Sequence, residues 1–287
     1  MSSVFKHELS LHFHSLIAYV FGAALLLFVG LGVTVVNLEY EWATFEYALM
    51  QSLFFLAFVF PILTMRTFSE ERHQKTDQLL YSLPVSTTEV VLGKFLALLV
   101  IFLIPCLIIG FYPLILSKYG EIFMPASYGT LLAFFIMGAA FITIGMFISS
   151  LTESQAFACG LGIAALVVNY YLVSLAQTIS ETTWGSLIAF IVIAVAIAGI
   201  VYYFTKNTDI SFGVGIVLVA AVGVAFWINN GIFKGLLPAL MRQISLFSRF
   251  TTFVNGVFDL TAIVFYLSVI IFFLFLTVQA LEKRRYN

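Results

Sequence analysis

Residues 68–94 read FSEERHQKTDQLLYSLPVSTTEVVLGK and gather charged side chains between two long apolar runs. Only 9% of the 287 residues are charged, whereas 62% are hydrophobic. A soluble domain has about 25% charged residues. This composition predicts a polytopic membrane protein, an all-α helix bundle that forms one transmembrane domain over residues 1–287. In such a chain the charges of residues 68–94 need an explanation of their own.

Apolar runs long enough to cross a membrane recur along the whole chain. A spanning helix needs about 20 mostly apolar residues. The sequence predicts six to eight spans and favours eight, of which the seventh is short and rich in glycine and could be re-entrant instead. The runs lie near residues 16–36, 45–66, 87–116, 127–150, 156–176, 184–204, 210–228 and 258–281.

The distribution of lysine and arginine predicts the orientation, because these residues concentrate in cytoplasmic connections. With the N-terminus inside, nine of them fall on the cytoplasmic side and four outside. We therefore expect a multi-pass protein of the plasma membrane with both termini in the cytoplasm. An even number of spans agrees with this orientation.

Residues 232–256 form an outer connection with helical periodicity. Apolar residues recur every three or four positions from Leu240 to Val254, and Arg242 and Arg249 fall on another face. This period predicts an extracytoplasmic amphipathic helix. A helix in the outer membrane interface is the favoured interpretation, and a lid over an exit pathway is the alternative.

The start of the charged stretch predicts a short cytoplasmic helix over residues 70–82. Ser69 is the expected N-cap, and the acidic residues after it suit the first turn of a helix. Glu71 and Lys75 have the spacing of a favourable ion pair. Pro84 is expected to end the helix.

The end of the stretch predicts the start of the next span. Ser86 and Glu89 have the spacing of a capping box, and Lys94, about two turns further on, is expected to snorkel back to the cytoplasmic interface. A solvated loop would explain the basic residues but neither the helix signals nor the acidic residues. A docking surface for a cytoplasmic partner explains them better.

The same stretch resembles the signature region of ABC-2-type transporter permeases, which lies between their second and third spans. The C-terminal stretch FDLTAIVFYLSVIIFFLFLTVQALEKRR (258–285) is similar to the last span and basic tail of this family, closest to its gliding-motility and copper-processing branch. Lys75 stands where the family usually has glycine. The matching residues are Glu71, Arg72, Thr76, Leu79, Leu80, Pro84, Val85, Gly93 and Lys94.

The resemblance implies that residues 69–83 are a coupling helix, which docks in a groove of a separate cytoplasmic ATPase. The chain would then be the permease subunit of an ABC transporter that exports an unknown substrate. The alternative is a permease that relays ATPase motion to an extracytoplasmic partner without transport. The implied coupling residues are Glu70, Glu71, Arg72, Thr76, Leu79, Leu80, Leu83 and Pro84.

The implied partners are the cytoplasmic ABC ATPase, a second permease copy or a paralogue, the lipid bilayer, and on the alternative an extracytoplasmic auxiliary protein. No Walker-type motif is present, so we expect no catalytic residue and no cofactor in this chain, with ATP and Mg²⁺ held by the partner. Neither a metal site nor a basic surface for nucleic acid is expected.

Two further sets of residues have two interpretations each. Asn169, Tyr170, Tyr171 and Ser174 could line a substrate path, but a helix-to-helix hydrogen bond is the favoured role for Asn169. Small residues at 138, 145, 160 and 162 could serve internal packing or a dimer seam. The histidine-containing N-terminus predicts an amphipathic helix at the cytoplasmic interface.

Overall fold

A computed structural model of the chain describes residues 2–75, 86–178, 183–205, 208–228 and 230–285. The described residues form helices and turns with no strand, which confirms the predicted all-α class. In chain order the elements are α1 (Ser2–His14), α2 (Leu16–Val33), the π-helix η1 (Thr34–Glu39), α3 (Phe45–Thr64), α4 (Ser69–His73), α6 (Thr87–Ile109), α7 (Tyr112–Leu116), α8 (Met124–Leu151), α9 (Gln155–Thr178), α10 (Thr183–Thr205), α11 (Thr208–Ile228), the 3₁₀-helix η2 (Asn230–Phe233), α12 (Leu236–Ile244), α13 (Leu246–Val254) and α14 (Leu260–Arg285).

Within the described part of the chain, seven helices are long and apolar enough to cross a membrane, so the protein is a multi-pass membrane protein. Helix α10 matches the sixth predicted run, residues 184–204, and its Thr183–Val195 portion is apolar but shorter than a span. Helix α11 is continuous, which favours a full span over a re-entrant segment. The seven spans are Leu16–Glu39, Phe45–His73, Thr87–Leu116, Met124–Leu151, Gln155–Thr178, Ser211–Ile228 and Leu260–Arg284.

The chain divides into two compact units, which are described separately. Unit 1 comprises residues 1–170 and 249–287, and unit 2 comprises residues 171–248. The single domain over residues 1–287 stays a prediction.

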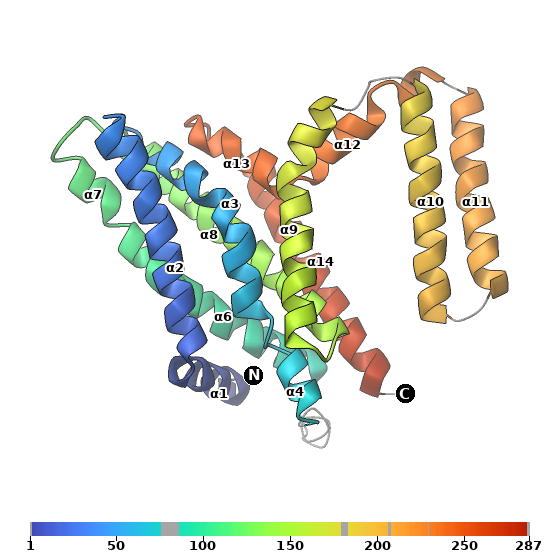
Figure 1. The fold of residues 1–287 in the computed structure, drawn as a ribbon, viewed down its shortest axis with the longest axis horizontal. Coiled ribbons are helices and arrows are strands. Elements are labelled where there is room, and N and C mark those ends of the chain that lie inside the picture. Colours follow the sequence, from blue (N-terminus) through green and yellow to red (C-terminus); the bar gives the residue numbers. More distant parts are fainter. Residues whose placement is uncertain (1, 76–85, 179–182, 206–207, 229, 286–287) are drawn as a thin grey trace. The chain divides into compact units, whose positions relative to one another are not determined.

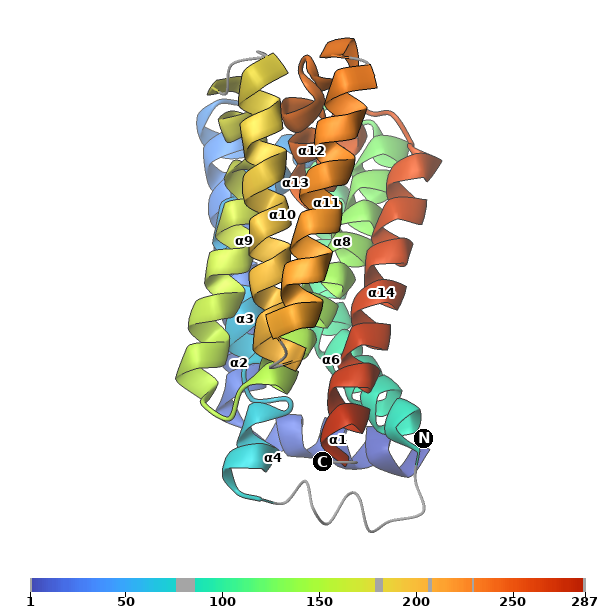
Figure 2. The same cartoon turned by 90° about the vertical axis from the view of Figure 1, so that its right-hand side faces the viewer.

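In unit 1, helices α2, α3, α6, α8 and α14 pack side by side, and α8 contacts α3, α6 and α14 (Figures 1 and 2). A helix is present at the N-terminus as α1, and it packs against α6 and α2; its amphipathic character stays a prediction. Helix α4, α1 and the end of α14 lie at the same end of the unit (Figure 1). This arrangement places the two termini and α4 on one side of the spans, as the predicted orientation requires.

The core of unit 1 is filled by phenylalanine rings. Phe60 of α3 packs edge-to-face against Phe102 of α6, with ring centroids 5.0 Å apart, and against Phe141 of α8 at 5.4 Å. Phe21 of α2 joins the cluster at 5.5 Å from Phe60. All four side chains are fully buried. Gly138 of α8 faces this cluster, and a Cβ there would overlap the rings of Phe60 and Phe102.

The other small residues differ in what they face. A Cβ at Gly145 would overlap the side chain of Thr64, and one at Gly162 would lie 2.9 Å from Cβ of Pro61. Gly138, Gly145 and Gly162 therefore serve packing within the chain. A Cβ at Gly160 would meet nothing within 4 Å.

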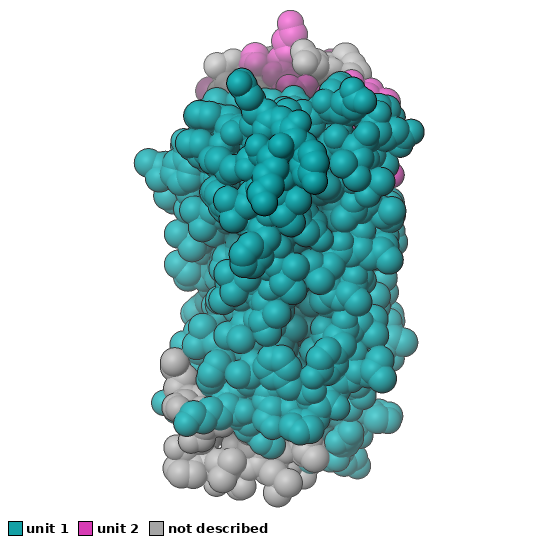
Figure 3. Space-filling view, turned by 90° about the vertical axis from the view of Figure 1, so that its left-hand side faces the viewer, with its two compact units in different colours: residues 1–170, 249–287 teal, residues 171–248 magenta. Residues whose placement is uncertain are grey.

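The outside of unit 1 is apolar along its spans. Leu27 and Leu31 of α2 are 55% and 52% exposed, as expected for a helix that meets lipid. Figure 3 shows unit 1 from the side on which α2 and α7 lie in Figure 1.

Unit 2 is built on a hairpin of α10 and α11. The hydroxyl of Ser211 donates a hydrogen bond of 2.6 Å to the carbonyl of Ala198. Phe226 of α11 lies between Trp184 and Phe233, with ring centroids 5.3 and 5.4 Å away. These contacts join both helices of the hairpin to η2.

The amphipathic segment that the sequence places outside the membrane is two helices and not one. Ser245 has extended backbone angles (φ −67°, ψ 119°) and separates α12 from α13. Its hydroxyl accepts the backbone N–H of Ser248 at 3.2 Å, a capping bond that starts a new helix. Later in α13, Phe250 is fully buried against Phe134 of α8, and Thr130 donates to the carbonyl of Phe253 at 3.0 Å. The prediction of one helix from Leu240 to Val254 is therefore wrong.

We predict that Gly138→Ala lowers the free energy of unfolding by about 1–3 kcal/mol, because the added methyl group has to displace packed rings. Gly160→Ala in α9 is the matched control and should not lower stability, because its Cβ would meet nothing within 4 Å and alanine favours a helix over glycine. Thermal unfolding of the two purified variants in the same detergent measures the difference. Equal unfolding temperatures for Gly138→Ala and the parent chain would contradict the packing argument.

Candidate functional site

The candidate site is the corner between α3 and α4, together with the helices that hold it. Helix α3 ends at Thr64, and the next residues turn the chain into α4. The hydroxyl of Thr67 donates to the carbonyl of Thr64 at 2.9 Å, which closes the turn. The hydroxyl of Ser69 donates back to the carbonyl of Met65. Phe68 occupies the N-cap position of α4, so the prediction that Ser69 is the N-cap is wrong.

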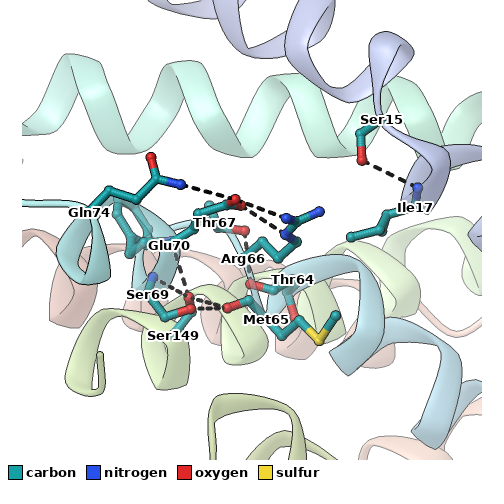
Figure 4. A network of polar contacts seen from close by, with 11 residues as sticks. Ser15, Ile17, Thr64, Met65, Arg66, Thr67, Ser69, Glu70, Gln74 and Ser149 are labelled. Atoms are coloured by element: carbon teal, nitrogen blue, oxygen red, sulfur yellow. Dashed lines mark hydrogen bonds and ion pairs between the residues drawn. The ribbon is translucent and has the colours of Figure 1, made fainter. Parts of the chain in front are cut away.

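A serine near the end of α8 anchors this corner (Figure 4). The hydroxyl of Ser149 accepts the backbone N–H groups of Phe68 and Ser69 at 3.1 and 3.2 Å and donates to the carbonyl of Met65 at 3.0 Å. Ser149 is fully buried. Because buried backbone groups need partners, one hydroxyl satisfies three atoms of the turn and fixes it to α8. Nothing in the sequence distinguishes this serine from its neighbours.

Arg66 and Glu70 form an ion pair across the same corner. Nε of Arg66 lies 2.8 Å from Oε2 of Glu70, and its Nη2 donates to Oε1 at 2.9 Å. The two side chains are 37% and 30% exposed. A pair this exposed adds little stability, so its main effect is on the direction of both side chains (Figure 4).

A buried lysine joins α4 to two other helices. Nζ of Lys94 in α6 lies 2.7 Å from Oε1 of Glu71 in α4 and 2.7 Å from Oε1 of Glu8 in α1. The Lys94 side chain is 3% exposed, Glu8 is 7% and Glu71 is 25% exposed. The ring of Phe68 lies 5.4 Å from the ammonium. The prediction that Lys94 snorkels to the interface is wrong, because two carboxylates reach it inside the protein.

Lys94, Glu8 and Glu71 form a triad whose contribution to stability depends on its burial. A buried charge that loses its partner costs about 3–5 kcal/mol, because the remaining ion is left without compensation in a poorly polarisable environment. Residue 93, next to the lysine, is a glycine because a Cβ there would lie 3.0 Å from Cγ1 of Val4. The pair Gly93–Lys94 therefore seats α1 on α6 by packing and by charge.

The predicted coupling residues fall into two groups. Glu70, Glu71 and Arg72 lie together in α4, and Arg72 is 6% exposed. The other five lie outside the described residues; these are Thr76, Leu79, Leu80, Leu83 and Pro84. The role of all eight in coupling stays a prediction. The predicted capping box is confirmed, since Ser86 Oγ accepts the N–H of Glu89 at 3.3 Å and Glu89 Oε2 accepts the N–H of Ser86 at 3.4 Å.

Lys75 has a left-handed backbone with φ of +57°. Helix α4 has already ended at His73, so an uninterrupted helix over residues 70–82 is wrong. An L-residue with a side chain pays about 1–2 kcal/mol for this conformation, and glycine does not. This geometry explains why a glycine suits the position.

The other predicted site residues lie in α9. Tyr170 packs edge-to-face against Phe54 of α3, with ring centroids 5.3 Å apart, and Asn169 is partly buried beside it in sequence. Tyr171 is 45% exposed, and Ser174 is exposed. A path-lining role stays a prediction.

An open groove lies beside α4, lined by His73, Glu153, Ser154 and Gln155. Glu153 also approaches Arg284 of α14, with 3.8 Å between Oε1 and Nη1. The groove therefore connects the end of α4 with the turn between α8 and α9. Within the described ranges, no three histidine, cysteine or acidic residues lie together as metal ligands.

The chain matches the model of a known family. A model of the family described as "ABC-2 family transporter protein" matches residues 41–205, more than half of the chain. The match includes α4 and the start of α6, and it leaves out α1. No curated protein and no solved structure matched the chain.

We predict that Ser149→Ala loosens the corner. The N–H groups of Phe68 and Ser69 lose their acceptor, and each buried unsatisfied group costs about 1–3 kcal/mol. Hydrogen exchange at residues 65–75 should become faster. Ser150→Ala is the matched control, because the Ser150 hydroxyl bonds only within its own helix, to the carbonyl of Phe147. Equal exchange in both variants would contradict the anchor.

We predict that Lys75→Gly stabilises the end of α4 by about 1 kcal/mol, since glycine adopts a positive φ without strain. Gln74→Gly is the control, because Gln74 has ordinary right-handed angles (φ −85°, ψ −4°). Hydrogen exchange over residues 69–75 should slow only for Lys75→Gly. Faster exchange in that variant would mean that the lysine side chain contributes more than its backbone costs.

Proposed function

The chain belongs to the ABC-2 family of transporter proteins, and we propose that it is the permease subunit of a complex in which a separate cytoplasmic ATPase drives export. Members of this family are membrane components of transporters and are not themselves catalytic. The proposed complex pairs this chain with a second permease copy or a paralogue and with two ATPase subunits, in the plasma membrane with both termini in the cytoplasm.

One observation carries this proposal, namely the attachment of α4 to the spans. Helix α4 follows α3 after a short turn, and its base is held by Ser149 of α8 and by Lys94 of α6. A force applied to α4 therefore reaches three spanning helices. A loop that only connected two spans would not need these buried anchors.

The contact with the ATPase is proposed at the end of α4. His73, Gln74 and Lys75 are exposed there, beside the groove that continues to Glu153. We expect residues 76–84, which lie outside the described residues, to extend this contact. Glu71 takes part indirectly, since its carboxylate is bound by Lys94.

Export through such a complex is proposed to occur between two copies. The interior of unit 1 is filled by buried aromatic rings, so a passage would run along a surface of the unit. The same filled interior supports the alternative, a permease of the gliding-motility type that relays ATPase motion to an outer protein. ATP turnover that responds to no cargo, with an outer-face protein co-purified, would favour this alternative.

We predict that His73→Glu combined with Lys75→Glu reduces the co-purified ATPase at least about tenfold, because two new negative charges at a contact oppose docking. Lys118→Glu, a charge reversal in the connection at the opposite end of α6, should change nothing. Affinity purification of tagged variants, with quantification of the ATPase, makes the comparison. Undiminished ATPase with the double variant would rule out this end of α4 as the contact.

A further inference from the structure

Helix α1 lies outside the residues that the family match covers, yet its only acidic residue contacts a lysine inside them. Glu8 is the sole carboxylate of α1 and is nearly buried. We propose that Glu8 is a positioning residue for α4: through Lys94, α1 fixes the orientation in which α4 meets its partner. Only the role of that partner rests on the proposed function.

The geometry makes the two carboxylates depend on each other. One ammonium serves both, at 2.7 Å from Glu8 and 2.7 Å from Glu71. Lys94 is 2% exposed overall, so its ammonium is shielded from solvent and depends on these two carboxylates for compensation. Its position between the carboxylates is a compromise, and a change at Glu8 shifts the cation that Glu71 holds.

A simpler role would be to fasten α1 to α6. Packing already does this one residue earlier, where Val4 and the backbone of Phe5 lie against Gly93. Fastening alone would also not explain why α4 shares the same ammonium. The shared cation is the feature that a positioning role accounts for.

Through Lys94 and Glu8, α4 is also connected to the first spanning helix, α2. Helix α1 ends at His14, and α2 begins at Leu16. Ser15 joins them, and its hydroxyl accepts the N–H of Ile17 at 3.3 Å as the cap of α2. A displacement of α4 is therefore carried through Lys94 and Glu8 to α2, besides its direct connection to α3.

The test is hydrogen exchange at α4 after a change in α1. The whole chain in lipid nanodiscs, without any ATPase, is compared with its Glu8→Gln variant. We expect the amides of Ser69–Lys75 to exchange about tenfold faster in Glu8→Gln, because local opening depends on the anchors of a segment. Lys6→Gln removes an exposed charge two residues away on the same helix and should have no effect.

A second variant covers the case in which Glu8→Gln disturbs α1 itself. Glu8→Leu replaces the buried carboxylate by an apolar side chain of similar size, which favours continued packing on α6. Faster exchange at α4 in Glu8→Leu supports the proposal. Unchanged exchange at α4 in both variants overturns it, whatever happens to α1.

The proposed function is tested separately in the assembled complex. With the ATPase bound, Glu8→Gln should lower transport-linked ATP turnover about tenfold, a usual size for coupling between sites, and leave co-purification intact. If no ATPase associates with the unmodified chain, the proposed function fails. The exchange measurement still decides the role of Glu8 in that case.

Discussion

The ammonium of Lys94 imposes the constraint on which the end of unit 1 that carries α1 and α4 depends. A lysine head group this deeply buried requires negative partners, because an uncompensated charge inside a protein is very costly. The partners are Glu8 of α1 and Glu71 of α4, two residues more than 60 positions apart in the chain. Satisfying one charge thus fixes three elements at one point.

The two ends of the α3–α4 corner are held by different chemistry. Ser149 satisfies backbone groups, and its three hydrogen bonds fix where the chain turns. Lys94 binds a side chain, and it fixes the face that α4 turns toward the spans. The core between the spanning helices is filled by phenylalanine rings, and contacts between these rings include no hydrogen bond or ion pair. A displacement of α4 is therefore opposed at two polar points and transmitted into a core that moves as packed bodies.

The sequence predicted the spans well because apolar length is a property of each segment alone. It also predicted the capping box at Ser86 and Glu89, which depends on residues three apart. The role of Lys94 was missed because its two partners lie on other helices. One feature of the sequence could have indicated the pair. Glu8 and Lys94 are each a single charge on an apolar helix face, and opposite charges without a partner on their own helix tend to pair with each other. Ser149 gave no signal, since Ser150 beside it lies equally close to the end of α8.

The break between α12 and α13 was missed for a related reason. An apolar residue every three or four positions is compatible both with one helix and with two that share a phase. Only the cap that Ser245 forms distinguishes them, and its extended backbone is decided by the local turn. The periodicity of residues 240–254 therefore predicted helical structure correctly, but it could not predict where one helix ends and the next begins.

Lys75 connects the local backbone to the proposed mechanism. A left-handed residue directly after α4 ends the helix sharply, so α4 is a short, anchored base and not the start of one long rod. A partner that presses on the residues beyond Lys75 would act through this turn. The strain that a lysine pays there is small beside the buried triad next to it, and the turn therefore yields before Glu71 leaves Lys94. On this argument a glycine at position 75 and this chain's lysine give the same geometry at different cost, and the anchor at Lys94 keeps α4 in place with either residue.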